Sequence, residues 1–351
     1  MKKIKLLICI ISSTLVLLLF GSIALFIISD TLFEQQASER WGKGFAQISV
    51  FYTADTGVSL TTYQGYDRAV KKKLTENSLS ENIVSAYASL PTAVTLTTAD
   101  GKTTAASAYF TGGDFFRFHP YELLSGGYYG SDTVEPNVIV IDETAAWQLF
   151  GSSDVSGKAV FIDGNLFTIY AVIRPPDDSF TKKTYGDKPR VFISFAAAEK
   201  ALKGYDSSIK AINCLEFIIE NPVKSTALGI VKDGIGYTDT DIDIEIVENS
   251  ARFDIDKIVP KIPKLALMGV RDKPMVYPFY ENAARIAETQ MQFVWILIFI
   301  DLAVWLVFSA IGSRYGIITI KEKAKREIPR LLLNINRRKH KVSDGDNGGN
   351  P

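Results

Sequence analysis

The sequence predicts an α+β domain held between two membrane-spanning helices. The first observation is a pair of long apolar runs, Ile4–Ile28 and Phe293–Ile311. Each is long enough to cross a bilayer, because a helix needs about 20 mostly apolar residues to span about 30 Å of hydrocarbon. The second observation is that segments 48–87 and 213–247 each show strand, helix and strand patterns in turn, which indicates two β-α-β units. With 351 residues, the chain has room for a membrane anchor and one extended or two small domains.

The charges that flank the apolar runs predict how the chain crosses the membrane. Lysines precede the first run and several Lys and Arg residues follow the second, while acidic residues lie on the facing sides. Basic flanks stay in the cytoplasm. We therefore expect spans at 1–29 and 291–313, an extracytoplasmic domain at 30–290 and a basic cytoplasmic tail at 314–351. A cleaved signal peptide remains an alternative for the first run, although the run is long and lacks a small-residue cleavage site.

Composition limits the partners of the main domain. Lys and Arg together number 39, as do Asp and Glu, but basic residues concentrate at the two ends and leave the middle acidic. An acidic middle excludes nucleic acid as a partner of that domain. Cys9 lies in the first apolar run and Cys214 in the middle, so the two cannot pair across a membrane boundary. The outer domain must therefore be held by its own core, without an internal disulfide.

The first half of the outer domain is predicted from periodicity and turn residues. Tyr63, Tyr66 and Val70 share one face at helical spacing. Asp100-Gly101 marks a hairpin turn. The expected elements are a stalk helix at 31–44, a strand at 48–52, a helix at 63–74, and strands at 82–87, 92–98 and 103–109.

The second half follows from caps and a second hairpin. Asp142 is a suitable N-cap and Gly151 a suitable stop for the helix between them. Asp163-Gly164 marks a turn, and Pro222 suits the first turn of a later helix. The expected elements are strands at 138–141, 159–162, 166–173 and 191–194, a helix at 195–202, a strand at 213–220, a helix at 222–233, a strand at 241–247, a linker at 259–263, and a helix at 280–292 that continues into the second span.

A series of short motifs between Tyr109 and Val172 is distinctive in order and spacing. They are Asp114-Phe115-Phe116, Leu123-Leu124-Ser125-Gly126, Val138-Ile139-Val140-Ile141-Asp142-Glu143, Ala146-Trp147-Gln148-Leu149-Phe150-Gly151, Asp154-Val155, Gly157-Lys158 and Phe167–Val172. In these residues the chain resembles the periplasmic core domain of MacB-like and FtsX-like ABC transporter permeases.

This resemblance implies an outer domain of two lobes. A membrane-proximal lobe at 45–110 and 190–250 would contain the two β-α-β units, and a mixed distal lobe at 110–190 would be inserted between them. Family permeases have three spans after this domain, whereas one is present here, and Gly126-Gly127 stands where Gly-Arg is usual. The chain is therefore expected to be a truncated, two-span member that works with a separate ABC ATPase and a second permease-like subunit.

The sequence offers no complete phosphate-binding loop of the form G-x-x-x-x-G-K-[ST]. Gly101-Lys102-Thr103 lacks the upstream glycine, because Leu96 takes its position. Gly151–Lys158 is one residue too long, and Ala159 replaces the magnesium-binding hydroxyl. We therefore expect no cofactor and no enzymatic activity in this chain.

Other chemistry-bearing residues have simpler interpretations. His119 precedes a proline and is expected as a turn residue rather than a general base. Cys214 is expected to be a buried, effectively apolar residue on a strand. The alternating acids of segment 239–245 are expected to form a solvated strand face rather than a calcium site, because the spacing of a calcium-binding loop is missing.

The aromatic segment 115–129 has two interpretations. Phe115, Phe118, Tyr128 and Tyr129 are candidates for an exposed surface that binds an apolar ligand or a peptide partner. The favoured alternative places the phenylalanines in the core of the distal lobe.

Asp301, in the middle of the second apolar run, is the candidate for an intramembrane contact. A carboxylate near the bilayer centre costs about 2.5–3.5 kcal/mol on insertion scales, so it normally faces a partner or a cavity. Together with the small residues Ala303 and Ser309 it predicts a helix–helix contact with a partner permease. The alternative is a tolerated, protonated acid that faces the first span.

The basic tail has three interpretations. Lys and Arg residues surround Leu331-Leu332-Leu333 within 317–341, so this segment is expected on anionic lipid or docked on a cytoplasmic ATPase. The third is a stop-transfer anchor that ends in a disordered tail, with 343–351 disordered in any case.

Two functions from different classes follow. The chain is predicted to be a permease-like, non-ATPase subunit of an ABC transport system in the cell membrane, whose outer domain binds or gates a substrate or transmits force. The alternative is a membrane-anchored extracytoplasmic interaction or sensing module without transport activity.

Overall fold

The computed structural model describes residues 2–32, 40–42, 44–130, 137–201, 211–267 and 275–343. These divide into two units. One contains Met1–Leu25 with Val294–Pro351, and the other contains Phe26–Phe293.

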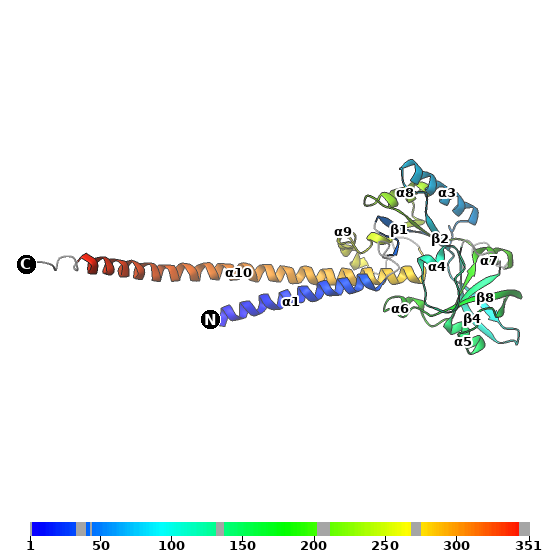
Figure 1. Ribbon diagram of the computed structural model, residues 1–351, viewed down its shortest axis with the longest axis horizontal. Helices are drawn as coiled ribbons and strands as arrows, with labels where there is room; N and C mark the ends of the chain where they lie inside the picture. Colours follow the sequence, from blue (N-terminus) through cyan, green and yellow to red (C-terminus); the bar gives the residue numbers. More distant parts are fainter. Residues whose placement is uncertain are drawn as a thin grey trace, which may run out of the picture. The chain divides into compact units, whose positions relative to one another are not determined.

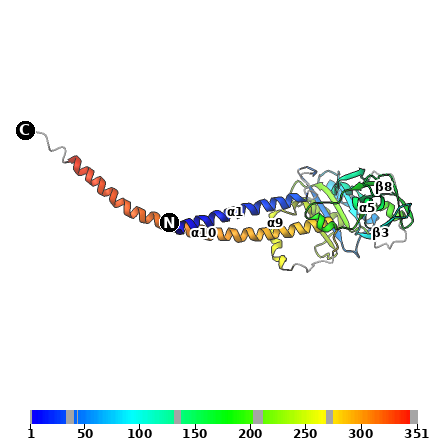
Figure 2. The same cartoon turned by 90° about the horizontal axis from the view of Figure 1, so that it is seen from below.

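Two long helices make up the first unit and continue into the second. They are α1, Lys2–Thr31, and α10, Phe279–Ser343. Segments Leu6–Thr31 and Phe279–Pro329 are long and apolar enough to cross a membrane. Within the first unit the helices lie side by side and antiparallel (Figures 1 and 2), with Gly21 against Ile298 and Gly312 against Leu7. The expected continuity of segment 280–292 with the second apolar run is confirmed, because α10 has no break.

The second unit begins with an antiparallel sheet built from the two expected β-α-β units. The first consists of β1 (Phe45–Tyr52), α3 (Leu60–Glu76) and β2 (Val84–Ala88), and the second of β10 (Cys214–Glu220), α8 (Thr226–Ile235) and β11 (Ile244–Glu248). The strand order is β11-β1-β10-β2, so each unit contributes one central and one outer strand. This is the order of a ferredoxin-like βαββαβ arrangement, here divided by a long insertion.

The insertion forms a closed ring of strands. Its members are β3 (Thr92–Thr97), β4 (Thr103–Gly113), β6 (Val138–Asp142), β7 (Ala159–Ile162), β8 (Asn165–Ile173) and β9 (Arg190–Ser194). The ring runs β4-β3-β7-β8-β6-β9 and closes because β9 pairs in parallel with β4. A short strand, β5 (Leu123–Gly126), pairs with β8. Helices α4 (Phe115–Phe118), α5 (Glu143–Phe150), α6 (Thr181–Tyr185) and α7 (Phe195–Ala201) connect or cover these strands.

Strand β4 joins the ring to the first sheet. Its last residues, Thr111–Gly113, pair with Ala86–Ala88 of β2. Gly113 has a φ of +63°, and a side chain there would meet the carbonyl oxygen of Ser85 at 2.4 Å, so only glycine suits this crossing.

The central strand β1 is buried on both faces. Its successive side chains point to opposite faces of the sheet and so enter two different cores. Ala46, Ile48 and Val50 belong to the apolar core that includes α3 and α8. The residues between them face the other side, where Phe51 joins an aromatic core that includes Phe279 at the start of α10. The sheet is thus covered by two helices on one face and by the start of α10 on the other.

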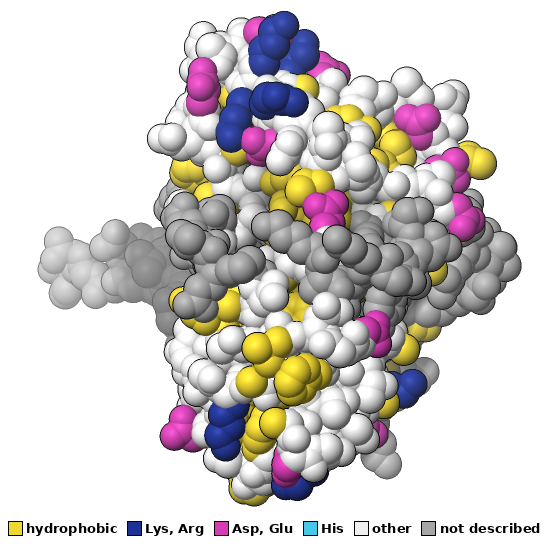
Figure 3. Space-filling model, turned by 90° about the vertical axis from the view of Figure 1, so that its right-hand side faces the viewer, with side chains coloured by type: hydrophobic (Ala, Val, Ile, Leu, Met, Phe, Trp, Pro, Cys, Tyr) yellow, Lys and Arg dark blue, Asp and Glu magenta, His cyan; other side chains and the backbone are white. Residues whose placement is uncertain are grey.

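One face of this unit carries charges of both signs (Figure 3). Lys and Arg side chains gather over the part that contains α3. The α3 lysines are paired locally, Lys71 with Asp67 at 2.8 Å and Lys73 with Glu76 at 3.0 Å. This part of the surface is therefore a mixed-charge helix face.

Several local predictions are confirmed. Tyr63 and Val70 are buried on α3. The Asp142 carboxylate accepts a hydrogen bond from the backbone N–H of Ala145 at the start of α5, and Gly151 ends that helix in the left-handed conformation.

Other boundaries were wrong. Helix α8 begins at Thr226 rather than Pro222, because the Asn221 side chain accepts from the backbone N–H of Ala227 at the first turn. Segment 259–263 is no linker. It lies in a 3-10 helix, Val259–Leu267, that follows α9 (Ile255–Ile258).

The expected stalk at 31–44 lies largely outside the described residues. Helix α1 ends at Thr31, and residues 33–39 and 43 are not described. The disorder expected at 343–351 also lies outside the described residues, apart from Ser343 at the end of α10.

Replacing Asp142 with asparagine should remove a pH-dependent part of the stability. Burial raises the pKa of the Asp142 carboxyl from 3.8 to about 6, although the backbone N–H groups of Ala145 and Arg190 and the Tyr185 hydroxyl donate to it. Because the folded-state pKa is the higher one, the folded chain binds more protons between these values, and this contribution to stability falls as the pH rises from 4 to 7. Denaturant unfolding of the full chain in detergent should show the wild-type advantage over Asp142→Asn shrinking by up to about 3 kcal/mol over that range. A difference that does not change with pH would contradict this.

Candidate functional site

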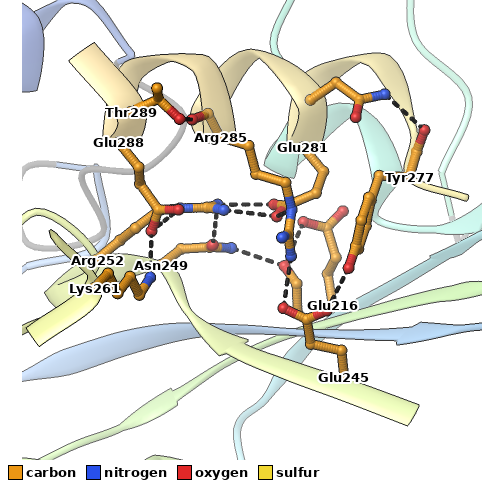
Figure 4. A network of polar contacts seen from close by, with 12 residues as sticks. Glu216, Glu245, Asn249, Arg252, Lys261, Tyr277, Glu281, Arg285, Glu288 and Thr289 are labelled. Carbon is orange, nitrogen blue, oxygen red and sulfur yellow. Dashed lines mark hydrogen bonds and ion pairs between the residues drawn. The ribbon is translucent and has the colours of Figure 1, made fainter. Parts of the chain in front are cut away.

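A buried network of charged side chains joins the first turns of α10 to the sheet (Figure 4). Its centre is Arg252, which follows β11 and is 3% exposed. The Arg252 guanidinium donates two hydrogen bonds to Glu281 of α10, at 2.7 and 2.6 Å. Glu281 is 1% exposed, so this bidentate pair is closed to solvent.

Further ion pairs extend the network along α10. The Arg252 Nε lies 3.0 Å from Glu288, which also pairs with Lys261 at 2.8 Å. Arg285 donates to Glu281 at 2.7 Å and to Glu245 of β11 at 2.6 Å. Three cations therefore meet three carboxylates, and the group is neutral when all six are ionised (Figure 4).

A chain of hydrogen bonds continues from Arg252 into the sheet. Arg252 donates to Asn249 at 3.2 Å, and the Asn249 amide donates to Ser49 of β1 at 2.7 Å. The Ser49 hydroxyl donates to Glu216 of β10 at 3.2 Å, and the other Glu216 oxygen lies 2.6 Å from Nε2 of His119. Polar contacts thus run without a break from the end of α4 to α10.

Neighbouring charges keep Arg252 ionised in spite of burial. Burial alone would lower the pKa of its guanidinium, but Glu281 and Glu288 outweigh burial and raise it. A buried charge of this kind is tolerated only when its partners are present, and removing one partner leaves the other uncompensated.

The local sequence explains how these side chains meet. Glu281, Arg285 and Glu288 recur at intervals of four and three residues, so they lie on one face of α10. Ser49 and Glu216 lie on the strand faces opposite the α3 and α8 core, which turns them toward α10. The result is a fixed attachment of a helix to a sheet. His119 and Glu216 are 1% and 2% exposed, so this pair has no access to a substrate.

Most of the predicted aromatic surface is buried. Phe115, Phe118 and Tyr129 are 1%, 0% and 5% exposed, so they offer no ligand surface and the surface prediction is wrong for them. They pack in the aromatic core, where Phe116 holds Tyr128 and Tyr129 at ring distances of 4.7 and 5.0 Å. The core alternative accounts for them because large apolar rings gain most when buried. Tyr128 is partly buried.

The intramembrane candidates lie on different sides of α10. Asp301 and Ser309 are partly buried and share a stripe, at helical spacing, with Ile298 and Gly312, which contact α1. Ala303 is exposed. The Oδ2 atom of Asp301 is buried and has no hydrogen-bond partner among the described residues. The stripe places Asp301 on the side of α10 that packs against α1.

The remaining candidates are structural. Cys214 is buried on β10, as expected, and accepts a hydrogen bond from Tyr280 at 3.4 Å. His119 caps α4, but it is a buried partner of Glu216 and no simple turn residue. The acids of segment 239–245 share no strand face, because β11 begins only at Ile244. In the described part of the chain, no group of three residues is suited to hold a metal ion.

The sequence does not predict this network. In the sequence, Glu281 and Glu288 belong to the acidic residues that precede the second apolar run. A useful signal was present, because charged residues at 281, 285 and 288 interrupt an alanine-rich helix on one face only. Arg252, in an irregular segment, gave no such signal.

Comparisons with known proteins identify one family and several similar solved structures. The family described as the MacB-like periplasmic core domain matches residues 9–262. The periplasmic region of MacB from Actinobacillus actinomycetemcomitans is 15% identical, with a TM-score of 0.41, over 67% of this chain and 97% of that one. The extracellular domain of the noncanonic ABC-type transporter YknZ from Gram-positive bacteria is 12% identical, with a TM-score of 0.37, over 57% of this chain and 100% of that one. No curated protein matches the chain.

Proposed function

The chain belongs to the family of the MacB-like periplasmic core domain, and from this membership we propose that it is a permease-like, non-ATPase subunit of an ABC transport system. A separate ABC ATPase would hydrolyse the ATP, in keeping with the lack of a G-x-x-x-x-G-K-[ST] loop in the 351-residue sequence. A second permease-like subunit would be its partner in the membrane.

The buried network around Arg252 is the observation that carries a force-transmitting role. It holds residues 281–288 of α10 against the sheet through ion pairs, and the central pair of Arg252 and Glu281 is buried. The same helix continues without a break into the apolar stretch that is suited to span the membrane. The outer domain therefore cannot rearrange around this network without moving the start of α10, and the reverse also holds.

The proposed topology places both termini in the cytoplasm and residues 30–290 outside. Its support is the distribution of Lys and Arg, which precede α1 and follow the apolar part of α10. In this orientation the force on the outer domain would reach the cytoplasmic side, where an ATPase acts, through α10.

Affinity purification tests the proposed function. The tagged full chain, purified from its own host in mild detergent, should bring down an ABC ATPase and a permease-like chain. An unrelated two-span protein with the same tag is the control. Recovery of the chain without an ATPase would count against the transport role and favour a membrane-anchored interaction or sensing module.

Asp301→Leu should weaken the partner contact proposed for Asp301, which shares one side of α10 with Ser309, while Ala303 lies on another side. A buried carboxyl oxygen without a donor is costly in hydrocarbon, so a partner helix that donates to this carboxyl group would gain affinity. We expect normal membrane insertion and a several-fold lower recovery of the permease-like partner. Thr14→Val is the matched control, because the Thr14 hydroxyl already donates to the Ile11 carbonyl at 2.9 Å. Equal partner recovery with both variants would show that Asp301 is merely tolerated.

A further inference from the structure

A hollow of about 210 Å³ lies in the second unit, beside the last residues of α1. Three separate segments line it: the end of α1, the loop after α4, and the loop between β8 and α6. The lining residues are Thr31, Leu32, Pro120, Tyr121, Glu122, Arg174, Pro175, Pro176, Asp177, Asp178 and Thr181. The polar network of α10 uses none of them, so the hollow is a separate feature.

The position of the hollow follows from the chain itself. Thr31 is the last residue of the segment Leu6–Thr31, which is long and apolar enough to cross a membrane. Thr31 is one of the residues that line the hollow. The hollow therefore lies where this helix would leave the hydrocarbon, within reach of both lipid headgroups and the aqueous phase.

Charge in the lining is unbalanced toward the negative. Three carboxylates, Glu122, Asp177 and Asp178, face a single cation, Arg174. Arg174 forms an ion pair with Glu122 at 2.6 Å. The Asp178 carboxylate accepts hydrogen bonds from the backbone N–H groups of Phe180 and Thr181. These bonds orient the carboxylate, but they bring no positively charged group to balance its charge.

Asp177 is the carboxylate of the lining that can accept further hydrogen bonds. It is exposed, and its side chain has no hydrogen bond or ion pair with any residue in the described part of the chain. An ionised carboxylate accepts up to about four hydrogen bonds, so it has room for a donor that arrives with a ligand.

The remaining walls are apolar. Three prolines, Leu32 and the ring of Tyr121 supply surface that suits carbon rather than water. Proline rings hold their shape, so these walls are already formed before a ligand binds.

We propose that this hollow binds a primary ammonium group attached to a short apolar segment. The ammonium group has three donors and one positive charge, which match the free carboxylates. A metal ion fits less well, because the described residues contain no group of three suitable ligands. The volume of about 210 Å³ is enough for a small amine or a headgroup.

Two sources can supply this group, an aminophospholipid in the outer leaflet or a free amine in the water. The inference goes beyond the transport proposal and does not depend on it, because binding at this hollow needs neither an ATPase nor a second subunit.

The test uses the full chain in phosphatidylglycerol nanodiscs, which contain no amine. Butylammonium binding is followed by saturation-transfer NMR, with butanol as the uncharged probe of matched length. We expect saturable binding of butylammonium and at least a fivefold weaker signal from butanol. Asp177→Asn and Asp177→Lys should raise the butylammonium Kd by about threefold and tenfold or more. Asp187→Asn, an exposed acid outside the lining, is the matched control and should leave the Kd unchanged.

A second arm identifies the source. If phosphatidylethanolamine added to the nanodiscs competes with butylammonium, the bound group is a lipid headgroup, and if it does not, the ligand is a free amine. Both results support an ammonium site. The proposal is overturned if Asp177→Lys binds butylammonium as the wild type does, or if butanol binds equally well. Because Asp177 is exposed and makes no contact that folding requires, loss of the fold does not confuse the result.

Discussion

Replacing Arg252 with methionine should lower the free energy of unfolding of the full chain by about 3–5 kcal/mol, the usual cost of removing one partner from a buried ion pair. The variant leaves the carboxylates of Glu281 and Glu288 buried next to an apolar side chain. Arg285 and Lys261 compensate only in part. Arg285 also pairs with Glu245, and the Lys261 side chain is exposed to solvent. Denaturant unfolding in detergent, followed by near-UV circular dichroism, measures the change.

Two variants make this result specific. Lys224→Met removes an ion pair of similar length with Asp254 and Asp256, but that pair is exposed, so it should cause little change. Adding Glu281→Leu and Glu288→Leu to Arg252→Met should recover much of the loss, because an apolar cluster no longer buries uncompensated charge. A loss with Arg252→Met no greater than with Lys224→Met would show that the network contributes little to holding α10.

His119→Leu should also be strongly destabilising, by about 3–5 kcal/mol, because it leaves Glu216 buried without its closest partner. The two side chains are 2.6 Å apart and almost without exposure. The contacts that remain to Glu216 are longer, 3.2 Å to Ser49 and 3.5 Å to Gln47. The same unfolding measurement applies, with Glu216→Leu and the double variant completing a double-mutant cycle.

The double variant decides the interpretation. Replacing both residues should lower the free energy of unfolding by about 0.5–3 kcal/mol less than the sum of the two single variants, because no member of the buried pair is then left without its partner. Phe115→Leu changes a ring whose centroid lies 4.6 Å from that of His119 but removes no hydrogen bond to Glu216, so its coupling with Glu216→Leu should be smaller than that of His119→Leu. Additive losses from His119 and Glu216 would mean that their contact carries no energy of its own.

Local signals explain why most of the elements were found from the sequence. The helix that contains Tyr63 and Val70, the capped helix after Asp142 and the hairpin at Asp163-Gly164 all depend on residues close together in the chain. Propensity, capping and turn conformation act over a few residues, so they can be read without a partner segment.

The closed ring of strands was not found, for a physical reason. It depends on β4 pairing in parallel with β9, which brings Ser107 next to Arg190. The paired parts of both strands are largely buried, and nothing in either sequence specifies which neighbour it will take. The aromatic segment shows the same limit, because a run of rings fits a buried core and an exposed patch equally well until the covering segments are placed.

Two apolar helices around an α+β domain with two β-α-β units were determined by the sequence alone, since apolar length and residue periodicity are properties of neighbours along one chain. Only the tertiary structure decided which charges are buried together. Arg252 lies 29 residues from Glu281, Ser49 lies 200 from Asn249, and His119 lies 97 from Glu216. A charge is stabilised by whatever partner the fold brings within about 3 Å, and that distance is unrelated to the number of residues between them.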